Sequence, residues 1–358
     1  MKITSLKVRN FRNIEEIEFI PSEEINIIHG SNAQGKTNII EALWLFTGEK
    51  SFRGTKDKEM ILFGENKAKL NLEFFASKRK QEAEIEIENK RKATLNGINL
   101  TTARKLAEEI HEIVFSPEHL SLVKAGPEER RDFLNVAISK LYGTYSDILR
   151  KYYRVLKQRN TILKDAEKNP SLLNFLEDFD ISLATYGESI IKMRKKYTER
   201  IKEYIPKFFS GLSDNKETLE IEYNISFEAE KKEEILEKLK ENLREDKKTQ
   251  RTSVGPHRDD LTFYINGIDA RTFGSQGQQR SIVLALKMAE AELLKEITGE
   301  KPIILLDDVM SELDPKRQDY LLNHIKGEQV FITCCDPDTI KRLKEGKTFL
   351  IEKGRIKE

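Results

Sequence analysis

Hydrophobic and polar residues alternate along the first part of the chain, a pattern that is typical of β-strands. The alternation predicts strands at Ile3–Val8, Glu16–Ile20, Ile25–His29, Ala68–Phe75 and Ala83–Glu88. Asn96-Gly97 lies between two further short runs, and this dipeptide favours the tight turn of a β-hairpin. We therefore expect residues 1–120 to form a mixed α/β region.

The hydrophobic period lengthens at Pro127, where apolar residues begin to recur every three or four positions as far as Phe209. Such spacing predicts long amphipathic helices. One apolar stripe of a single helix is predicted from Ile190, Met193, Tyr197, Ile201, Tyr204 and Phe208. A short strand (Leu219–Ile225) and a charged helix (Lys231–Arg244) are expected to follow.

The α/β pattern returns after Thr249. It predicts, in order, a second hairpin at Asn266-Gly267, a helix at Gly277–Ile297 and a fully apolar strand at Ile303–Leu306. The simplest architecture is one α/β domain, residues 1–120 and 251–358, interrupted by a mainly helical insertion at residues 121–250.

Composition restricts the possible functions. Charged residues make up 34% of the 358 residues, yet the formal net charge is only +1, so nucleic-acid binding would depend on local basic patches. Cys334 and Cys335 are adjacent and give no disulfide framework, which favours a reducing cytosol. There is no apolar stretch near the roughly 20 residues of a membrane helix and no signal-peptide core. We expect a cytoplasmic protein.

A glycine-rich segment joins the third predicted strand to a helical pattern and fits the Walker A motif G-x-x-x-x-G-K-[ST]. Glycines let backbone N–H groups surround phosphate oxygens at a helix N-terminus. Lys36 is expected to reach the β- and γ-phosphates of ATP, and the Thr37 hydroxyl to bind Mg²⁺. The predicted nucleotide contacts are Gly30, Ser31, Asn32, Ala33, Gln34, Gly35, Lys36, Thr37 and Asn38.

A second acidic motif follows the apolar strand Ile303–Leu306, where Asp307 and Asp308 form a Walker B pattern. Asp307 is expected to hold Mg²⁺ together with Thr37, and Asp308 to orient or deprotonate the attacking water. Lys36 and Asp308 are therefore the predicted catalytic residues.

Two more motifs narrow the class. Ser311 and Asp314 follow Walker B at the spacing of the D-loop in ABC-type ATPases. Ser275, Gln276, Gly277 and Gln278 precede a predicted helix and are similar to the signature motif of the same class. Unpaired N–H groups and the positive end of a helix favour an anion at such a position, although the segment alone is also a good helix cap.

Taken in combination, these motifs resemble the RecF family of recombination and gap-repair proteins, short-armed relatives of the chromosome-structure (SMC) ATPases. The resemblance spans nearly the whole chain. It rests on Arg9–Asn13, Gly30–Thr37, Ser51–Arg53, Phe115–Glu118, Gly126–Arg131, Gly255–Asp260, Phe273–Arg280 and Leu305–Asp314.

The resemblance implies an α/β head of the ABC/SMC P-loop ATPase type with an inserted, mainly helical arm. It implies a homodimer that forms on ATP, with each nucleotide held between Walker A of one subunit and the signature motif of the other. It further implies weak, DNA-stimulated hydrolysis, binding to gapped DNA, and work with RecR and RecO to load RecA recombinase. By the same resemblance, Arg12 reaches the nucleotide.

Some positions depart from the wider ABC pattern. Gln276 stands where transporter signatures have glycine, and Asp308 stands where many relatives have glutamate. Cys335 lies near the position of the switch histidine, and Phe115–Glu118 takes the place of a Q-loop glutamine. These departures argue against fast turnover.

Other P-loop classes fit less well. The long interval between Thr37 and Ser275 argues against a transporter subunit, and the chain is too short for a long-armed chromosome ATPase. Asn89–Lys92 lacks the final aspartate of a guanine-reading motif. Two alternatives stay open: an ATP-gated DNA clamp in which hydrolysis is incidental, or another short-armed SMC-like ATPase.

The basic run Thr144–Lys164 carries six basic residues against Asp147, with Tyr152 and Tyr153 between them. Backbone contacts from such a run would be sequence-independent and salt-sensitive. A second run, Ile190–Lys207, has seven basic residues against two glutamates. Solvated helix faces explain either run equally well. The predicted DNA contacts are Arg150, Lys151, Arg154 and Lys157.

Overall fold

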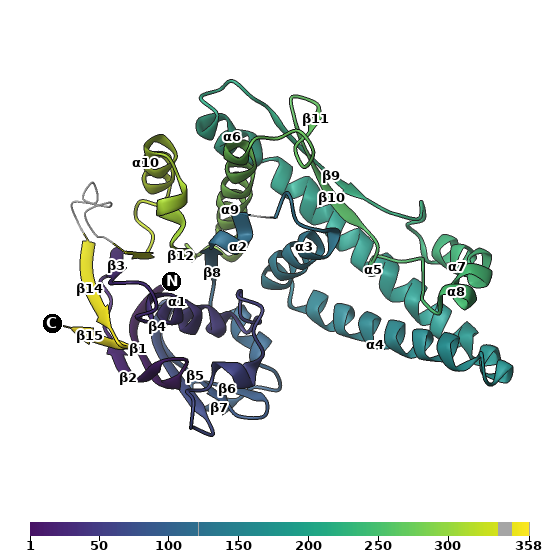
Figure 1. The fold of residues 1–358 in the computed structure, drawn as a ribbon, viewed down its shortest axis with the longest axis horizontal. Coiled ribbons are helices and arrows are strands. Elements are labelled where there is room, and N and C mark those ends of the chain that lie inside the picture. Colours follow the sequence, from purple (N-terminus) through teal and green to yellow (C-terminus); the bar gives the residue numbers. More distant parts are fainter. Residues whose placement is uncertain (121, 336–345, 358) are drawn as a thin grey trace. The chain divides into compact units, whose positions relative to one another are not determined.

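The computed structural model describes residues 1–120, 122–335 and 346–357 (Figure 1). The chain divides into two compact units. The first unit comprises Met1–Ser121, Lys207–Lys216 and Arg280–Glu358, and the second comprises Leu122–Pro206 and Glu217–Gln279. This division follows contacts in space. The predicted division followed the change in hydrophobic pattern near residues 120 and 250, and those domain limits stay a prediction.

The first sheet of the first unit is antiparallel, in the order β2-β1-β4-β5-β6-β7. Its strands are β1 (Lys2–Phe11), β2 (Ile14–Phe19), β4 (Ala68–Ala76), β5 (Arg79–Ile87), β6 (Arg91–Leu95) and β7 (Ile98–Asn99). Alternate residues such as Leu70 and Leu72 are buried, and Leu70 pairs with Ile85 on the same face. Asn96 and Gly97 both have positive φ, which confirms the predicted hairpin turn.

The second sheet of the first unit is mostly parallel, in the order β15-β14-β3-β13-β12-β8. Its strands are β3 (Ile25–His29), β8 (Glu112–Phe115), β12 (Ile303–Asp307), β13 (Val330–Cys334), β14 (Gly346–Glu352) and β15 (Arg355–Lys357). All five residues of β12 are buried, as expected for a central parallel strand covered on both faces. Helix α1 (Lys36–Trp44) packs against β12, β13 and β1, so it bridges the two sheets.

The second unit is mainly helical and carries one small sheet, β11-β10-β9. Helices α4 and α5 pack against each other, and α5 also packs against α7 and β9 (Figure 1). The bounds are α3 (Pro127–Leu141), α4 (Gly143–Asp165), α5 (Leu176–Lys202), α7 (Lys232–Glu241), α8 (Leu243–Thr249), β9 (Leu219–Asn224), β10 (Asp260–Ile265) and β11 (Ile268–Asp269).

The remaining α-helices are α2 (Pro117–Leu120), α6 (Ile205–Leu212), α9 (Gln276–Thr298) and α10 (Pro315–His324). In the parts of the chain that the structure covers, none of the helices is long and apolar enough to cross a membrane.

Two predicted helices are interrupted. The predicted single stripe that ends at Phe208 is wrong, because α5 ends at Lys202 and α6 begins at Ile205. Pro206 explains the break, since proline lacks an N–H and disfavours a helical residue before it. The predicted helix Lys231–Arg244 divides at Asn242, whose side-chain amide donates to the Lys238 carbonyl at 2.9 Å, a local bond that competes with helix continuation.

Candidate nucleotide-binding site

The carboxyl ends of four parallel strands of the first unit meet at one edge of the second sheet. Strands β3, β13, β12 and β8 are neighbours in that order and run parallel. The Walker A loop follows β3, the Walker B aspartates end β12, and Cys335 follows β13. Ligands of open α/β sheets bind at such an edge, so the topology brings the predicted motifs of the first unit together.

The Walker A loop has the strained backbone that its glycines permit. Gly30 has φ 147° and Gly35 has φ 110°, conformations that residues with a Cβ rarely adopt. A Cβ on Gly30 would lie 2.4 Å from the Ile351 carbonyl oxygen, and one on Gly35 would lie 2.8 Å from Asn13 Oδ1. Any larger residue at either position would therefore deform the loop.

The Lys36 ammonium lies inside this loop and is buried. It donates to the carbonyl oxygens of Gly30 at 2.8 Å and Ser31 at 3.0 Å. The Cys335 sulfur is 3.8 Å away, and its thiol donates to Asn32 Oδ1 at 2.9 Å. Among the described residues, the ammonium is bound by neutral groups and no carboxylate lies at hydrogen-bond distance from it, so an anion entering the loop would meet its positive charge.

Asp307 faces the start of α1 and accepts two hydroxyl hydrogen bonds on one oxygen. Thr37 Oγ1 donates to Asp307 Oδ1 at 2.9 Å, and Thr333 Oγ1 donates to the same oxygen at 2.8 Å. Burial raises the pKa of Asp307 to about 6, although both hydroxyl bonds oppose the rise; the charges of Asp308 and Glu118 add to it. A bound cation would remove this penalty, because it favours the ionised carboxylate.

The residues present fit Mg²⁺. Mg²⁺ prefers oxygen ligands and usually combines one or two protein groups with water and substrate phosphates. Thr37 and Asp307 supply a hydroxyl and a carboxylate side by side. Within residues 1–120, 122–335 and 346–357, no group of three or more His, Cys, Asp and Glu side chains could hold a metal ion by itself, so nucleotide oxygens would have to complete the shell.

Within the described part of the chain, Asp308 is held by hydrogen bonds of its backbone. Its φ is 50°, its N–H donates to Thr333 Oγ1 at 2.9 Å, and its carbonyl accepts from Ser311 Oγ at 2.7 Å. Thr333 therefore contacts both aspartates of Walker B. The predicted role of Asp308 toward the attacking water stays a prediction, and so does the nucleotide role of Ser311.

Asp314, the other predicted D-loop residue, is the N-cap of α10. Its carboxylate accepts from the Arg317 N–H at 3.1 Å and forms an ion pair with the Arg317 guanidinium. Arg317 Nε also donates to Ser281 Oγ at 2.8 Å. This arrangement stabilises the turn that follows Walker B.

The signature segment belongs to the second unit and begins α9. The Ser275 N–H donates to Gln278 Oε1 at 2.7 Å, and the Gln278 N–H donates to Ser275 Oγ at 3.2 Å, a reciprocal capping box. Ser275 and Gln276 are exposed, and Gly277 is half-buried. Contact with the γ-phosphate of a second subunit stays a prediction.

Arg12 is bound to a buried carboxylate that the sequence analysis did not single out. Its Nε and a terminal nitrogen donate to Glu41 at 2.8 and 2.6 Å, and Glu41 on α1 is fully buried. Glu41 also accepts from Ser51 Oγ and lies 3.6 Å from Arg53. This ion pair explains the family-like Ser51–Arg53 segment; contact of Arg12 with nucleotide stays a prediction.

Two further residues support the site. The Asn38 side-chain amide donates to Asn13 Oδ1 at 2.7 Å, so the first turn of α1 is bonded to the turn between β1 and β2. Thr333 reaches the aspartates because β13 lies between β3 and β12. Glu41 could have been identified from the sequence, because it is a charged residue within an apolar helical pattern. The role of Thr333 could not, because only the order of the strands brings it next to the aspartates.

The predicted DNA residues Arg150, Lys151, Arg154 and Lys157 are all exposed on α4 of the second unit. Two arginines counted in the basic runs are not surface residues: Arg159 and Arg194 are fully buried. Arg159 forms ion pairs with Asp180 at 2.5 Å and Asp246 at 2.6 Å. The count of basic surface charges is therefore lower than expected in both runs.

A strained glycine loop around a buried lysine, with a buried aspartate bonded to the threonine after that lysine, defines a P-loop ATPase domain. The chain belongs to the RecF/RecN/SMC N-terminal domain family, which it matches over residues 2–357.

Proteins named RecF match the chain along nearly their whole length. The chain is 41% identical to the DNA replication and repair protein RecF of Lachnoclostridium phytofermentans over 362 residues, or 100% of each chain. It is 39% identical to that of Agathobacter rectalis over 362 residues, or 99% of each chain. A solved structure described as the recombination mediator protein RecF-ATP in the RecFOR pathway is 36% identical, with a TM-score of 0.92 over 99% of this chain and 97% of the other. The predicted family and fold class are confirmed.

Proposed function

We propose that this protein is an ATP-dependent DNA-binding protein of recombinational and replication-gap repair. The observation that carries the ATP-dependent part of the proposal is the direct bond between Thr37 of Walker A and Asp307 of Walker B, because it brings together the two groups that we propose to hold Mg·ATP. The similarity to RecF proteins, one of them described with ATP, supports the same function.

ATP is expected to draw Lys36 from the Gly30 and Ser31 carbonyls onto the β- and γ-phosphates. The backbone N–H groups of the loop would surround the phosphates at the N-terminus of α1. Thr37 and Asp307 would hold Mg²⁺, which supplies positive charge to the phosphate oxygens when it is bound. Because Asp307 must ionise for this, binding near pH 6 should release protons.

Hydrolysis is proposed to be weak and stimulated by DNA. Asp308 would accept a proton from the water that attacks the γ-phosphorus, while ADP leaves. The signature residues Ser275, Gln276, Gly277 and Gln278 would act on the nucleotide of a second subunit. The capping box between Ser275 and Gln278 supports this, since it presents an exposed serine at a helix N-terminus.

The partners are proposed from the relatives. The name "DNA replication and repair protein" and the RecFOR pathway support action at gapped DNA together with RecR and RecO, helping to load RecA. Arg150, Lys151, Arg154 and Lys157 are the proposed backbone contacts. ATP binding would join two copies, and DNA would stabilise the pair.

Complementation between two inactive variants tests the shared site. Ser275→Arg should leave ATP binding by the monomer nearly intact while abolishing ATP-induced dimers in sedimentation and ATP hydrolysis. Mixing it with Lys36→Arg rebuilds one site from wild-type Lys36 and wild-type Ser275 on different chains, so part of the ATPase activity should return. Full activity of dilute, monomeric Ser275→Arg would disprove the shared site.

The alternative of a clamp with incidental hydrolysis is separated by Asp308→Asn. This variant should keep Mg·ATP, because Thr37 and Asp307 remain, and should form a longer-lived ATP dimer. If DNA release needs hydrolysis, single-turnover release should slow severalfold relative to wild type; equal release rates would favour the clamp.

A further inference from the structure

A groove of about 410 Å³ lies on the second unit beside α4, between this helix and the chain that follows α8. Its lining residues are Tyr153, Leu156, Lys157, Asn160, Thr161, Lys164, Gln250 and Arg251. The residues from α4 recur every three or four positions and form one face of the helix. The groove therefore runs along the helix axis rather than across it.

Every charge that lines the groove is positive. Lys157, Lys164 and Arg251 are exposed, and no Asp or Glu belongs to the lining. In the described parts of the chain, none of these three side chains forms an ion pair, in contrast to Arg150, which pairs with Asp147 at 2.8 Å. Lys157 and Lys164 are two helical turns apart, about 10 Å, so they can contact two separate anionic groups.

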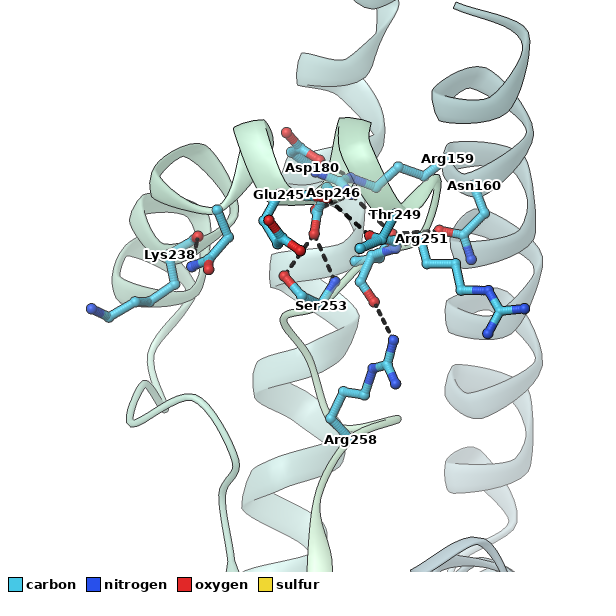
Figure 2. A network of polar contacts seen from close by, with 12 residues as sticks. Arg159, Asn160, Asp180, Lys238, Glu245, Asp246, Thr249, Arg251, Ser253 and Arg258 are labelled. Carbon is cyan, nitrogen blue, oxygen red and sulfur yellow. Dashed lines mark hydrogen bonds and ion pairs between the residues drawn. The ribbon is translucent and has the colours of Figure 1, made fainter. Parts of the chain in front are cut away.

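The far wall of the groove is fixed by a buried network (Figure 2). Arg159 on α4 pairs with Asp246 on α8 at 2.6 Å and with Asp180 on α5 at 2.5 Å. Beside it, Asn160 Oδ1 accepts from the Thr252 N–H at 2.8 Å and from its hydroxyl at 2.7 Å. These bonds tie both sides of Arg251 to α4.

Arg251 joins this network through its backbone, since its N–H donates to the Asp246 carbonyl at 3.2 Å, while its side chain stays outside. Gln250 has a left-handed backbone (φ 55°) and ends α8, which turns the chain toward α4. In Figure 2 the Arg251 side chain extends beside α4 and carries no dashed bond to the network. Its guanidinium is thus presented from a rigid backbone, which lowers the entropy that a ligand must overcome.

An aromatic side chain completes the groove. Tyr153 is 39% exposed, although its neighbour Tyr152 is buried. The two rings meet at 5.7 Å and 80°, so Tyr152 supports Tyr153 and restricts its motion. Exposed aromatic rings next to a basic groove are typical of sites for single-stranded nucleic acid, where bases can stack on the rings. A duplex hides its base faces and needs no such ring.

We propose that this groove binds a short segment of single-stranded nucleic acid, with Lys157, Lys164 and Arg251 on its phosphates and Tyr153 against a base. The proposal rests on the proposed DNA-binding function and adds the strand form and three residues, Lys164, Arg251 and Tyr153, to it. Binding would not depend on sequence, because phosphates and base faces are common to all nucleotides.

Fluorescence anisotropy of a labelled dT20 strand tests the proposal, with a labelled hairpin duplex as the second probe, both in the presence of Mg·ATP. The double variant Lys164→Ala/Arg251→Ala should bind dT20 about tenfold more weakly and lower the salt slope by about 1.4, roughly 0.7 for each lost single-strand contact. Affinity for the duplex should change less than threefold.

Two matched variants control for charge and shape. Lys247→Ala/Lys248→Ala removes the same charge from exposed positions of α8 outside the groove, and should leave dT20 affinity within twofold of wild type. Tyr153→Ala should weaken dT20 binding about tenfold, whereas Tyr153→Phe, which keeps the ring, should retain it. Unchanged melting temperatures would show that all the variants fold.

Three outcomes would overturn the proposal. Equal losses in the groove variant and the α8 control would mean general electrostatic attraction, and equal losses for dT20 and duplex would remove the single-strand assignment. Unchanged DNA affinity with lost binding of a poly-glutamate peptide would assign the groove to an acidic protein partner. If wild-type protein itself bound neither probe with Mg·ATP, the proposed DNA-binding function would fail as well.

Discussion

In the first unit, the described partners of the buried Lys36 ammonium are neutral groups, namely the Gly30 and Ser31 carbonyls and the Cys335 sulfur. In the second unit, the buried guanidinium of Arg159 bonds to two carboxylates. Asp307, like Lys36, is a buried charged group whose hydrogen-bond partners are neutral, because it accepts from the hydroxyl groups of Thr37 and Thr333. Burial raises the pKa of Asp307 to about 6. Buried charges are costly unless they are paired. We therefore expect Lys36 and Asp307 to bind a ligand, and Arg159 to stabilise the fold.

Polar side chains of the Gly255–Asp260 segment are also paired, as Arg159 is. Asp260 accepts from Arg130 at 2.6 and 2.8 Å, and Asp259 accepts from the Tyr223 hydroxyl. His257 lies between Tyr152 and the Thr252 carbonyl at 2.7 and 3.0 Å. This family-like motif therefore joins α3, α4 and the small sheet within the second unit.

The largest expected effect is on the paired charges. Arg159→Met would leave Asp180 and Asp246 buried without their cation and should lower the free energy of unfolding by about 3–5 kcal/mol, measured by urea unfolding followed by circular dichroism. Arg150→Met is the matched control on the same helix, because its pair with Asp147 is exposed, and it should change stability by less than about 1 kcal/mol. Equal effects would remove the distinction between the buried and the exposed ion pairs of α4.

Acid should weaken the second unit. Burial lowers the pKa of His257 to about 4, below its ordinary 6.5, so the unfolded chain binds more protons between these values and stability falls as pH drops from 6.5 to 4. The loss should reach about 3 kcal/mol. His257→Gln should flatten this dependence in circular dichroism, while His324→Gln, at an exposed position of the first unit, should leave it. If the pH dependence of stability persisted in His257→Gln, it would come from another titratable group.

The first unit should respond to pH in the opposite direction. The pKa of Asp307 is raised to about 6 from 3.8, so the folded state binds more protons between these values and the nucleotide-free protein gains stability as pH falls from 6 to 4. Asp307→Asn should stabilise nucleotide-free protein at pH 7 by up to about 3 kcal/mol while abolishing Mg²⁺-dependent ATP binding. Fluorescence of Trp44, the one tryptophan of the sequence, reports this unit. A destabilised Asp307→Asn would show that the carboxylate serves the fold.

The smallest effect on folding is expected at Lys36. Lys36→Arg should weaken ATP binding about a hundredfold, since a planar guanidinium does not replace a compact ammonium in the loop. Its unfolding free energy should stay within about 1 kcal/mol of wild type, because among the described residues the substitution changes only hydrogen bonds to neutral groups and leaves no buried carboxylate without a cation. Isothermal titration and urea unfolding measure the two quantities. Wild-type ATP affinity and hydrolysis would contradict the Walker A assignment.

The local motifs could be read from the sequence because their chemistry lies in neighbouring residues. Gly30 and Gly35 set the backbone of the loop, Lys36 and Thr37 follow at once, and Asp307 ends an apolar strand. Strand alternation and the Asn-Gly turns act over a few residues as well. These features made the P-loop class, the family and most elements predictable.

The tertiary structure alone decided which charges are buried and what they meet. Arg159 and Arg150 have the same side chain on the same helix, and nothing nearby in the sequence distinguishes them; Arg159 is buried because Asp180 and Asp246, 21 and 87 residues away, converge on it. Thr333 reaches the Walker aspartates only because β13 lies between β3 and β12, and Arg251 reaches α4 only through the turn after α8. The burial and pairing of a charged side chain depend on contacts between distant segments, and the hydrophobic pattern of one segment does not show which other segment will contact it.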